Sequence, residues 1–355
     1  MLSSQEQARY SKQIILPEVK LEGQQKLCAA KVLVIGAGGL GCPVLQYLAA
    51  SGVGTIGIAD GDIVSISNLQ RQVLYTEGEI GELKVAIASQ KLKALNPNTE
   101  LNTYPVFVDS RNILDIMRGY DIVVDGSDNF ATRYLINDAC VILDKPLVSG
   151  AIYKFEGQVS VLNYQGGPTY RCIFPEPPQD GESPNCADIG VIATLPGIIG
   201  SIQANEVIKM ITGIGEVLSG KLMVMDTLTM NTHTFSFKLN EVNKKIRQLQ
   251  AEAINCKASI GTIQYDELQA LLKNDTNIQL VDVRETEEHE MGHIGGINIP
   301  LSQFTTGYEQ LDPNRMVVLY CASGVRSNNA AKQLLQHGFT SILNLKDGVN
   351  ALSFY

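Results

Sequence analysis

Short β-branched runs alternate with helical patterns along the first 240 residues of the chain. The runs Lys31–Ile35 and Thr55–Ala59 flank an apolar helical pattern at Leu40–Ala50, and a glycine cluster separates the first run from that helix. Strand, glycine turn, helix and strand form the βαβ unit of a parallel sheet. Further helices are predicted at Lys84–Leu95 and Ala131–Leu143; further strands at Asp121–Val124, Pro146–Ser149 and Gln158–Leu162; and an antiparallel pair at Lys221–Met225 and Thr232–Phe237.

The pattern weakens after Leu239, where polar and charged residues dominate, and it then starts afresh. We expect a linker at 241–259 between a first domain at 1–240 and a second, smaller α/β domain at 260–355. The elements expected in the second domain are Tyr265–Leu272, Ile278–Val283, Met316–Cys321, Ser327–His337 and Ile342–Leu345. The predicted fold class is α/β, with a Rossmann-like, mainly parallel sheet in the first domain.

Composition and charge exclude several classes of protein. The 355 residues include 28 basic and 37 acidic side chains, and a net charge of −9 argues against a general nucleic-acid binder. The longest apolar stretch, Gly190–Ile202, is too short to span a membrane, and the polar positions Gln203, Asn205, Glu206 and Lys209 that follow indicate a buried helix. Seven cysteines without a C-x-x-C pair, and a polar N-terminus, favour a reduced cytoplasmic protein.

A glycine-rich turn is the first candidate site. Gly36-Ala37-Gly38-Gly39-Leu40-Gly41 has the G-x-G-x-x-G spacing directly after a predicted strand. Glycines allow close approach of the backbone, and the following helix offers free N–H groups to a phosphate. Asp60, at the end of the second strand, is placed to accept hydrogen bonds from ribose hydroxyls. The spacing predicts a nucleotide or dinucleotide site; the alternative is a glycine turn without a ligand.

Charged residues near the turn favour ATP over NAD. Arg71 and Lys84 suit a triphosphate, and Asp128, which follows a strand, suits Mg²⁺ held through ATP. Hydride transfer needs none of these groups. As isolated residues they are more often surface charges or a turn residue. The residues expected to bind nucleotide are Gly36, Gly38, Gly39, Gly41, Asp60, Asp62, Asn68, Arg71, Lys84, Asp128 and Asn129.

The first domain resembles the ubiquitin-activating-enzyme-like adenylyltransferases of molybdopterin and thiamine synthesis. The matching segments are Arg9–Gln13, the glycine turn, Asp60-x-Asp62, Asn68–Gln72, Lys84, Ser127–Asn129 and Asn185–Asp188. The resemblance implies that ATP activates the C-terminal Gly-Gly carboxylate of a small ubiquitin-like sulfur-carrier protein and that pyrophosphate is released. It also implies a homodimer in which the N-terminal segment of one subunit reaches the phosphates of its partner.

Two positions depart from the pattern of this family. Lys12 stands where the family usually has an arginine that acts on the phosphates, and it keeps the charge but not the bidentate fork. Arg9 is a second candidate for that role. The family also often has two C-x-x-C pairs that bind structural zinc, whereas here Thr169 replaces one cysteine of the first pair, beside Cys172, and no second pair follows Phe237. We expect no zinc, because a closed site needs four ligands.

A cysteine loop near the end of the sequence is the second candidate site. A predicted strand runs into Cys321, and the loop Ala322-Ser323-Gly324-Val325-Arg326 leads into a helix. Backbone N–H groups and the helix N-terminus lower the pKa of a sulfur held in such a loop. The alternatives are a buried structural cysteine and a phosphate loop, although the C-x5-R loop of cysteine phosphatases is longer by one residue. Together with Asp282–Glu285 and His293–Pro300, the loop resembles a rhodanese domain, which implies a persulfide on Cys321.

Cys186 follows a proline-rich loop, and the family resemblance places a sulfur-transfer cysteine there; the alternative is a small apolar filler. His289 and His293 are expected to be structural polar residues. The remaining cysteines are interpreted as structural: Cys28, Cys42, Cys140, Cys172 and Cys256.

The two sites together predict one pathway. An acyl-adenylate forms on the carrier, the Cys321 persulfide attacks it, and Cys186 releases a carrier thiocarboxylate. The expected catalytic residues are Lys12, Arg71, Lys84, Asp128, Cys186 and Cys321, with a cysteine desulfurase or thiosulfate as the sulfur donor. The alternatives are an NAD-dependent oxidoreductase and a module that binds a carrier without activating it. Molybdopterin, thiamine, cysteine and tRNA thiolation would each fit.

Overall fold

The structure is a computed structural model that describes residues 2–177, 190–249, 260–274, 278–313, 315–339 and 341–351. The chain divides into two compact units, Met1–Glu252 and Ala253–Tyr355. Each unit has its own sheet and its own hydrophobic cores. The two units are therefore described one after the other.

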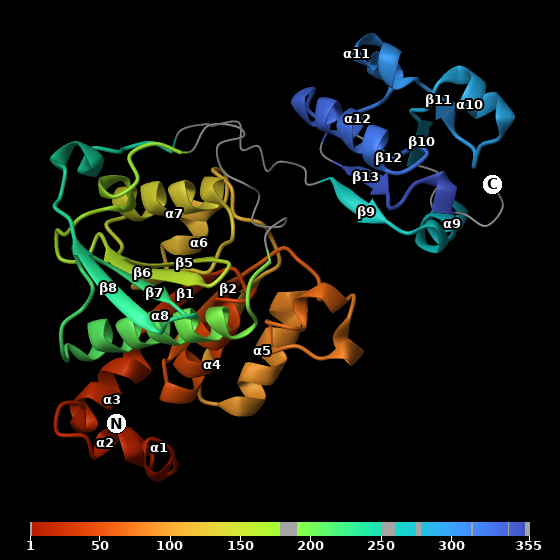
Figure 1. Ribbon diagram of the computed structural model, residues 1–355. Helices are drawn as coiled ribbons and strands as arrows, with labels where there is room; N and C mark the ends of the chain where they lie inside the picture. The colour runs from red at the N-terminus through yellow and green to blue at the C-terminus, as the bar shows by residue number, and fades with distance from the viewer. Residues whose placement is uncertain are drawn as a thin grey trace. The chain divides into compact units, whose positions relative to one another are not determined.

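The first unit is built on an eight-stranded sheet with the order β3-β2-β1-β4-β5-β6-β7-β8 (Figure 1). Its strands are β1 (Lys31–Ile35), β2 (Thr55–Ala59), β3 (Glu100–Tyr104), β4 (Ile122–Asp125), β5 (Leu147–Tyr153), β6 (Glu156–Leu162), β7 (Lys221–Asp226) and β8 (Asn231–Ser236). Neighbours from β3 to β5 pair in parallel, and those from β5 to β8 pair antiparallel. Ile35 lies opposite both Ala59 and Asp125, so three strands end level and their loops meet at one edge.

Helices cover both faces of this sheet. In Figure 1, α4 (Gly41–Ser51), α5 (Lys84–Leu95) and α8 (Thr194–Thr212) lie on one face, and α6 (Ile113–Met117) and α7 (Phe130–Ile142) lie on the other. Alternate strand residues serve the two cores because successive side chains point to opposite faces. Val32 and Val34 belong to the core beneath α4, whereas Leu33 and Ile35 belong to the core beneath α7.

Shorter elements complete the first unit. An N-terminal segment contains α1 (Ser4–Arg9), α2 (Ser11–Ile14) and α3 (Lys20–Ala29). The 3-10 turns are η1 (Ile66–Asn68), η2 (Glu77–Glu79), η3 (Tyr170–Cys172) and η5 (Glu241–Lys244). Because η5 and Leu249 contact the rest of this unit, the first part of the predicted linker is ordered structure, and residues 250–259 lie outside the described residues.

The second unit has a five-stranded parallel sheet with the order β11-β10-β12-β13-β9. Its strands are β9 (Gly261–Ile263), β10 (Ile278–Asp282), β11 (Ile297–Asn298), β12 (Met316–Tyr320) and β13 (Ile342–Leu345). Its helices and turns are α9 (Tyr265–Asn274), α10 (Thr286–Met291), η6 (Leu301–Gln303), α11 (Phe304–Gly307), η7 (Tyr308–Gln310), α12 (Val325–Gln336) and η8 (Val349–Ala351). The central strand β12 ends next to Cys321, so this cysteine lies at the middle of the carboxyl edge of the sheet.

The predicted fold class is confirmed, and each strand that the sequence predicts is present. The edge strand β3 was not predicted, because its residues Glu-Leu-Asn-Thr-Tyr are polar and partly exposed. The apolar stretch after Gly190 belongs to α8, whose buried residues include Gln203 and Glu206. Of the helices in the described part of the chain, none is sufficiently long and apolar to span a bilayer.

Candidate active sites

The glycine turn between β1 and α4 begins and ends with close backbone contacts that leave no room for a side chain at its first and last glycines. Gly36 has φ +94°, and a Cβ there would lie 2.6 Å from the carbonyl oxygen of Gly126. A Cβ on Gly41 would lie 1.9 Å from the carbonyl oxygen of Gly36. The turn is therefore tight, and it lies directly against the loop that follows β4.

Polar side chains surround the next two glycines. A Cβ on Gly38 would lie 3.6 Å from Gln72 Nε2, with no closer neighbour. One on Gly39 would lie 3.1 Å from Pro196 and 3.8 Å from Arg71 Cδ. The Arg71 guanidinium donates to the carbonyl oxygen of Ser67 over 3.0 Å. Gln72 is buried, and its Oε1 has no hydrogen-bond partner among the described residues. The turn thus has open space, donor groups and an unpaired polar atom.

Asp60 links the turn to a second charged pair. Its carboxylate accepts from the Ala37 amide over 2.7 Å and from the Asp62 amide over 2.8 Å. Burial raises the pKa of Asp60, although the nearby Lys84 and these amides oppose the rise. Lys84 is buried, and its Nζ lies 3.0 Å from Asp62 Oδ2. A buried lysine beside two carboxylates is a fixed positive charge at the edge of the turn.

The loop after β4 places Asp128 at the same edge of the sheet. Asp128 is exposed, whereas Asp125 is fully buried and accepts from both the amide and the hydroxyl of Ser127. Asn129 is the N-cap of α7, and its Oδ1 accepts from the Thr132 amide over 2.9 Å. The structure therefore gives Asn129 a capping role, and Asp128 is the exposed carboxylate of this loop.

These residues fit an ATP molecule with its metal ion. The α4 N-terminus and open space at Gly38 suit phosphates, and the unpaired Gln72 Oε1 is an acceptor for a ligand hydroxyl or amine. The two cations suit a polyphosphate. Exposed Asp128 supplies the hard oxygen that Mg²⁺ prefers, because this ion keeps several waters and takes few protein ligands. Asn68 lies at the end of η1, where its Oδ1 accepts from the Ser65 amide over 3.4 Å.

The N-terminal segment packs at the far end of α4. Tyr10 is buried, and its hydroxyl accepts from Asn96 Nδ2 over 2.8 Å, while Gln13 Nε2 donates to the Ser51 carbonyl over 3.0 Å. Arg9 donates to the carbonyl of Leu95, the last residue of α5. The glycine turn is at the other end of α4, about 16 Å away along an 11-residue helix. The structure thus does not bring Lys12 or Arg9 to the turn of its own chain.

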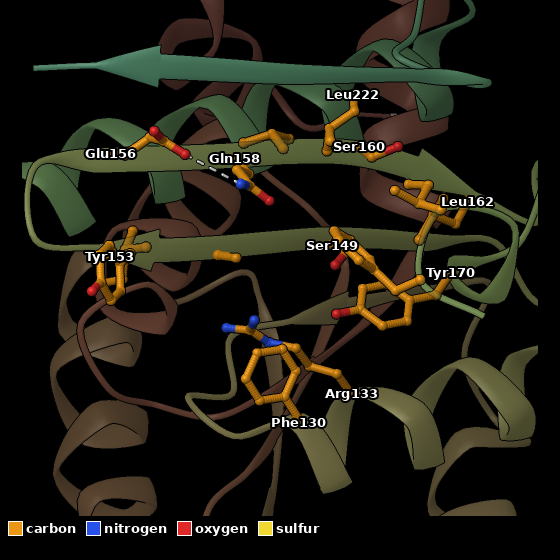
Figure 2. A pocket seen from close by; sticks show the side chains of 15 residues that line it. Phe130, Arg133, Ser149, Tyr153, Glu156, Gln158, Ser160, Leu162, Tyr170 and Leu222 are labelled. Carbon is orange, nitrogen blue, oxygen red and sulfur yellow. Dashed lines mark hydrogen bonds between the residues drawn. The ribbon is translucent and has the colours of Figure 1, made fainter. Parts of the chain in front are cut away.

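A pocket opens over β5 and β6 beside the loop that follows β4. It is lined by Phe130 and Arg133 of α7, by strand residues that include Ser149, Tyr153 and Gln158, and by Tyr170 (Figure 2). Arg133 Nη2 donates to the Ser127 carbonyl over 3.4 Å, while its buried Nε has no partner among the described residues. This arginine connects the pocket to the loop that presents Asp128.

Sequence reasoning missed Arg133, Asp125 and the role of Gln203. Gln203 Nε2 donates to the Asp125 carbonyl over 2.8 Å, and a Cβ on Gly150 would overlap its side chain. A polar residue within an apolar helix was the available signal for Gln203. Nothing local in the sequence marks Arg133, because it meets Ser127 and the strands only after α7 has packed.

The Cys321 loop joins β12 to α12. Cys321 is buried, and Ser327 Oγ donates to its Sγ over 3.3 Å. Burial raises the pKa of this thiol, but hydrogen bonds from Ser327 and from the backbone N–H groups of Ser323 and Gly324 outweigh burial and leave the pKa below its ordinary value. Gly324 has φ +81° and is the N-cap of α12, so Ala322-Ser323-Gly324 curls around the sulfur.

Arg326 is held by an acidic partner. Its guanidinium makes a bidentate pair with Glu288 at 2.6 and 2.7 Å, and this contact lowers the pKa of Glu288 to about 2. Val325, the first residue of α12, is exposed. The Cys321 sulfur therefore accepts several hydrogen bonds, while the charge of Arg326 is offset by Glu288.

Polar residues near the loop contact one another. Arg284 pairs with buried Asp282 at 2.7 Å, and His289 Nδ1 lies 2.9 Å from the same carboxylate. The rings of His289 and His293 stack with centroids 4.2 Å apart. This pairing agrees with the prediction that the two histidines are structural.

Cys186 and the rest of Asn185–Asp188 lie outside the described residues, as does Cys256. Cys42 and Cys140 are buried. Burial raises the pKa of Cys42 to about 12 and also raises that of Cys140, as expected of structural thiols. Cys28 and Cys172 are partly exposed.

Comparison with known proteins assigns both units. Residues 10–247 match the ThiF family, and residues 264–353 match the rhodanese-like domain. The chain is 41% identical over 366 residues to the probable adenylyltransferase/sulfurtransferase MoeZ of Mycobacterium tuberculosis, covering 99% of this chain and 93% of the relative. It is 50% identical over 243 residues to the sulfur carrier protein adenylyltransferase of Thermus thermophilus, covering 67% of this chain and 90% of the relative.

Solved structures agree with the fold of the first unit. The crystal structure of PaaA matches with a TM-score of 0.58 and 26% identity, covering 67% of this chain and 76% of that chain. Escherichia coli MccB with ATP matches with a TM-score of 0.55 and 23% identity, covering 62% and 67%, which shows the fold alone. The chain therefore belongs to the ThiF family, as a member that also contains a rhodanese-like domain.

Proposed function

We propose that this protein adenylates the C-terminal Gly-Gly carboxylate of a small ubiquitin-like sulfur carrier and then transfers sulfur to it from a Cys321 persulfide. The main support is that one chain has both a glycine turn with phosphate-binding groups and a donor-rich sulfur loop. Relatives that match over most of their length are named as a probable adenylyltransferase/sulfurtransferase and as an adenylyltransferase and sulfurtransferase. A relative named as a molybdopterin-synthase adenylyltransferase favours molybdopterin synthesis, and thiamine synthesis is the second candidate.

In the first reaction, a carboxylate oxygen of the carrier attacks the α-phosphorus of ATP and pyrophosphate leaves. Lys84 and Arg71 neutralise the phosphate charge, and the amides of the glycine turn with the α4 N-terminus hold the phosphates. Asp128 would hold a Mg²⁺ ion, which would screen the charge of the phosphates. Asp60 receives the ribose hydroxyls, since it stands at the end of β2.

The carrier tail is proposed to occupy the pocket over β5 and β6. An extended tail suits this site because the pocket runs beside open strand surface and its lining combines aromatic rings with polar groups. Arg133 lines this pocket (Figure 2) and contacts the Ser127 carbonyl, so its guanidinium charge would attract a tail carbonyl or carboxylate. This position would bring the Gly-Gly end toward the nucleotide.

A homodimer is proposed because Lys12 lies far from the turn of its own chain. Exposed apolar side chains occur in the N-terminal segment and near the turn, namely Ile15, Leu16, Ile66 and Val73, and they would be covered in a dimer. Lys12 of one subunit would then complete the phosphate site of the other. Its single charge replaces a bidentate arginine only in part.

In the second reaction, the outer sulfur of the Cys321 persulfide attacks the acyl-adenylate carbonyl, AMP leaves and an acyl-disulfide forms. The Cys186 thiolate then attacks the Cys321 sulfur, the carrier thiocarboxylate leaves, and a Cys186–Cys321 disulfide remains for reduction by cellular thiols. The persulfide is supplied by a cysteine desulfurase or thiosulfate. We place the reaction in the cytoplasm, without zinc, in a chain with domains at 1–240 and 260–355.

The test is mass spectrometry of a Gly-Gly carrier after incubation with ATP, Mg²⁺ and a persulfide donor. Replacement of one carrier oxygen by sulfur, dependent on ATP and on Cys321, is the expected result. Carrier-dependent exchange of labelled pyrophosphate into ATP reports the first reaction alone. A protein that binds NAD and shows no such exchange would be an oxidoreductase, and one that binds the carrier without exchange would be a binding module.

A further inference from the structure

Four groups from three residues of the first unit converge on one sulfur atom. Cys172 Sγ lies 3.4 Å from the Thr169 amide, 3.5 Å from Thr169 Oγ1, 3.4 Å from the Asn240 amide and 3.4 Å from Asn243 Nδ2. Thr169 and Cys172 are three residues apart at η3, and Asn240 and Asn243 are three residues apart at η5. Two short turns, about 70 residues apart in sequence, thus face each other across a thiol.

This arrangement has the spacing of two C-x-x-C pairs but not the ligands of a zinc site. Zinc sites use four thiolate, imidazole or carboxylate ligands, and Cys172 is one such group among these four residues. Asn240 Oδ1 is already the N-cap acceptor of the Val242 amide, over 3.2 Å. The Thr169 and Asn240 amides and the Asn243 side chain face the sulfur with N–H donors, which approach an electron-rich atom and not a cation. Within the described ranges, no cluster of three or more His, Cys, Asp or Glu side chains is suited to a metal ion.

The same segment is fastened by further contacts. Lys244 Nζ donates to Asn163 Oδ1 over 2.6 Å, and Asn163 Nδ2 in turn donates to the carbonyls of Cys140 and Lys145. Phe237 and Leu249, which flank η5, pack against the core beneath α7. A lysine ammonium at this point also makes the neighbourhood unfavourable for a second cation.

We propose that Cys172 is the acceptor centre of a metal-free clasp, in which Asn240 and Asn243 hold η5 onto η3 through hydrogen bonds to the sulfur, and Thr169 contacts the same sulfur from the start of η3. The clasp does the structural work that zinc does elsewhere in the family. It fixes the chain that follows β8, and it supports the turn from which Tyr170 and Ile173 reach the wall of the pocket. The clasp needs no bound metal or other ligand, because the Cys172 sulfur itself accepts the hydrogen bonds.

The first test rebuilds the metal site. Thr169→Cys, Asn240→Cys and Asn243→Cys in one chain supply the three missing thiolates, so the variant should bind about one zinc per chain, and a chelator should then lower its thermal midpoint. The unaltered protein, expressed with added zinc, should contain less than about a tenth of a zinc per chain, and the chelator should leave its midpoint unchanged. One chelator-sensitive zinc in the unaltered protein would overturn the proposal, as would a folded triple variant that binds none.

The second test measures the clasp without metal. Amide hydrogen exchange at Asn240, whose N–H donates to the sulfur, should rise about tenfold in Cys172→Ala, and exchange at Asn243 and Lys245 should also rise. Exchange in β1 and β4 should not change. Cys28→Ala is the matched control, because it removes another partly exposed thiol from the same unit. Unchanged amide exchange at Asn240 in Cys172→Ala would contradict the proposal, because the sulfur would then not hold η5 in place, whatever the zinc content of the protein.

Discussion

The glycine turn and the cysteine loop use the same backbone device for two chemistries. Each follows a strand of a parallel sheet and leads into a helix, so N–H groups converge on one point at the carboxyl edge. In the turn, Gly38 leaves that point open, whereas Gly39 packs against Pro196. In the loop, the Cys321 side chain itself fills the point, and the donors stabilise its sulfur. A glycine at the start of the turn leaves the N–H donors free for a phosphate, whereas a cysteine at the start of the loop supplies a sulfur that takes them up.

The treatment of positive charge also differs between the two sites. Lys84 is buried and paired with Asp62, so its position is fixed, and in the proposed reaction it would face the phosphates of ATP. Arg326 is about one-third exposed, and its bidentate contact with Glu288 largely cancels its charge. A thiolate needs only hydrogen bonds to be stabilised, whereas a triphosphate needs cations. The comparison predicts that removal of Cys321 stops sulfur transfer without affecting adenylation, and that removal of Asp128 slows adenylation without affecting persulfide formation on Cys321.

The largest expected effect comes from removing the sulfur. Cys321→Ala should abolish sulfur transfer to the carrier, because no other described cysteine lies in a loop of this kind, and it should leave carrier-dependent pyrophosphate exchange unchanged. Mass spectrometry of the carrier and a radiolabel exchange assay measure the two reactions. Cys28→Ala, which removes a thiol of the first unit, is the control. Thiocarboxylate formed at the normal rate by Cys321→Ala would mean that another cysteine receives the sulfur.

The reverse separation should follow from Asp128→Ala. Loss of the exposed carboxylate should slow adenylation about 100-fold or more, since a metal ion on the phosphates loses its protein ligand. Stability should change by less than about 0.5 kcal/mol, because Asp128 is a surface residue. Persulfide loading of Cys321 should be normal. Asp115→Ala, an exposed carboxylate on α6, is the matched control, and normal exchange by Asp128→Ala would remove Asp128 from the site.

The sequence predicted both loops because their chemistry is local. In the glycine turn and in Cys321–Ser327, residues next to one another in the chain form the site, so the backbone geometry follows from residue type. The pocket and the Cys172 clasp combine segments far apart in sequence, such as η3 and η5. Nothing in the local pattern near Asn240 indicates that it will meet Cys172, because its residues suit any solvated loop. Such sites become visible only when packing has placed the segments.

A smaller effect concerns the acidity of Cys321. Because hydrogen bonds hold the pKa of Cys321 below its ordinary value, the thiolate persists at a lower pH than in a free cysteine. The pH at which alkylation by iodoacetamide reaches half its maximal rate should therefore lie below that of a free cysteine. Ser327→Ala removes the hydroxyl donor and should move that midpoint upward by about one unit. Ser323→Ala, which keeps its backbone donor, should leave the midpoint unchanged.

The alkylation rate of Cys321 must be measured by mass spectrometry of the peptide that contains it. Burial raises the pKa of Cys172, but hydrogen bonds from Asn240, Thr169 and Asn243 outweigh it and lower that pKa as well. Labelling of both thiols would otherwise overlap. An unchanged midpoint in Ser327→Ala would show that the backbone amides alone stabilise the thiolate.

The smallest effect tests the neutralised cation of the loop. Glu288→Gln keeps the shape of the side chain but removes its charge, which leaves the Arg326 charge uncompensated near the sulfur. Thiosulfate is a dianion, so its transfer of sulfur to Cys321 should become about threefold faster at low salt, and the gain should shrink as ionic strength rises. Glu290→Gln removes a charge from the same helix but leaves the pair intact, so it should give a smaller gain. An equal gain from both variants would mean that general charge, and not Arg326, governs access of anions to the loop.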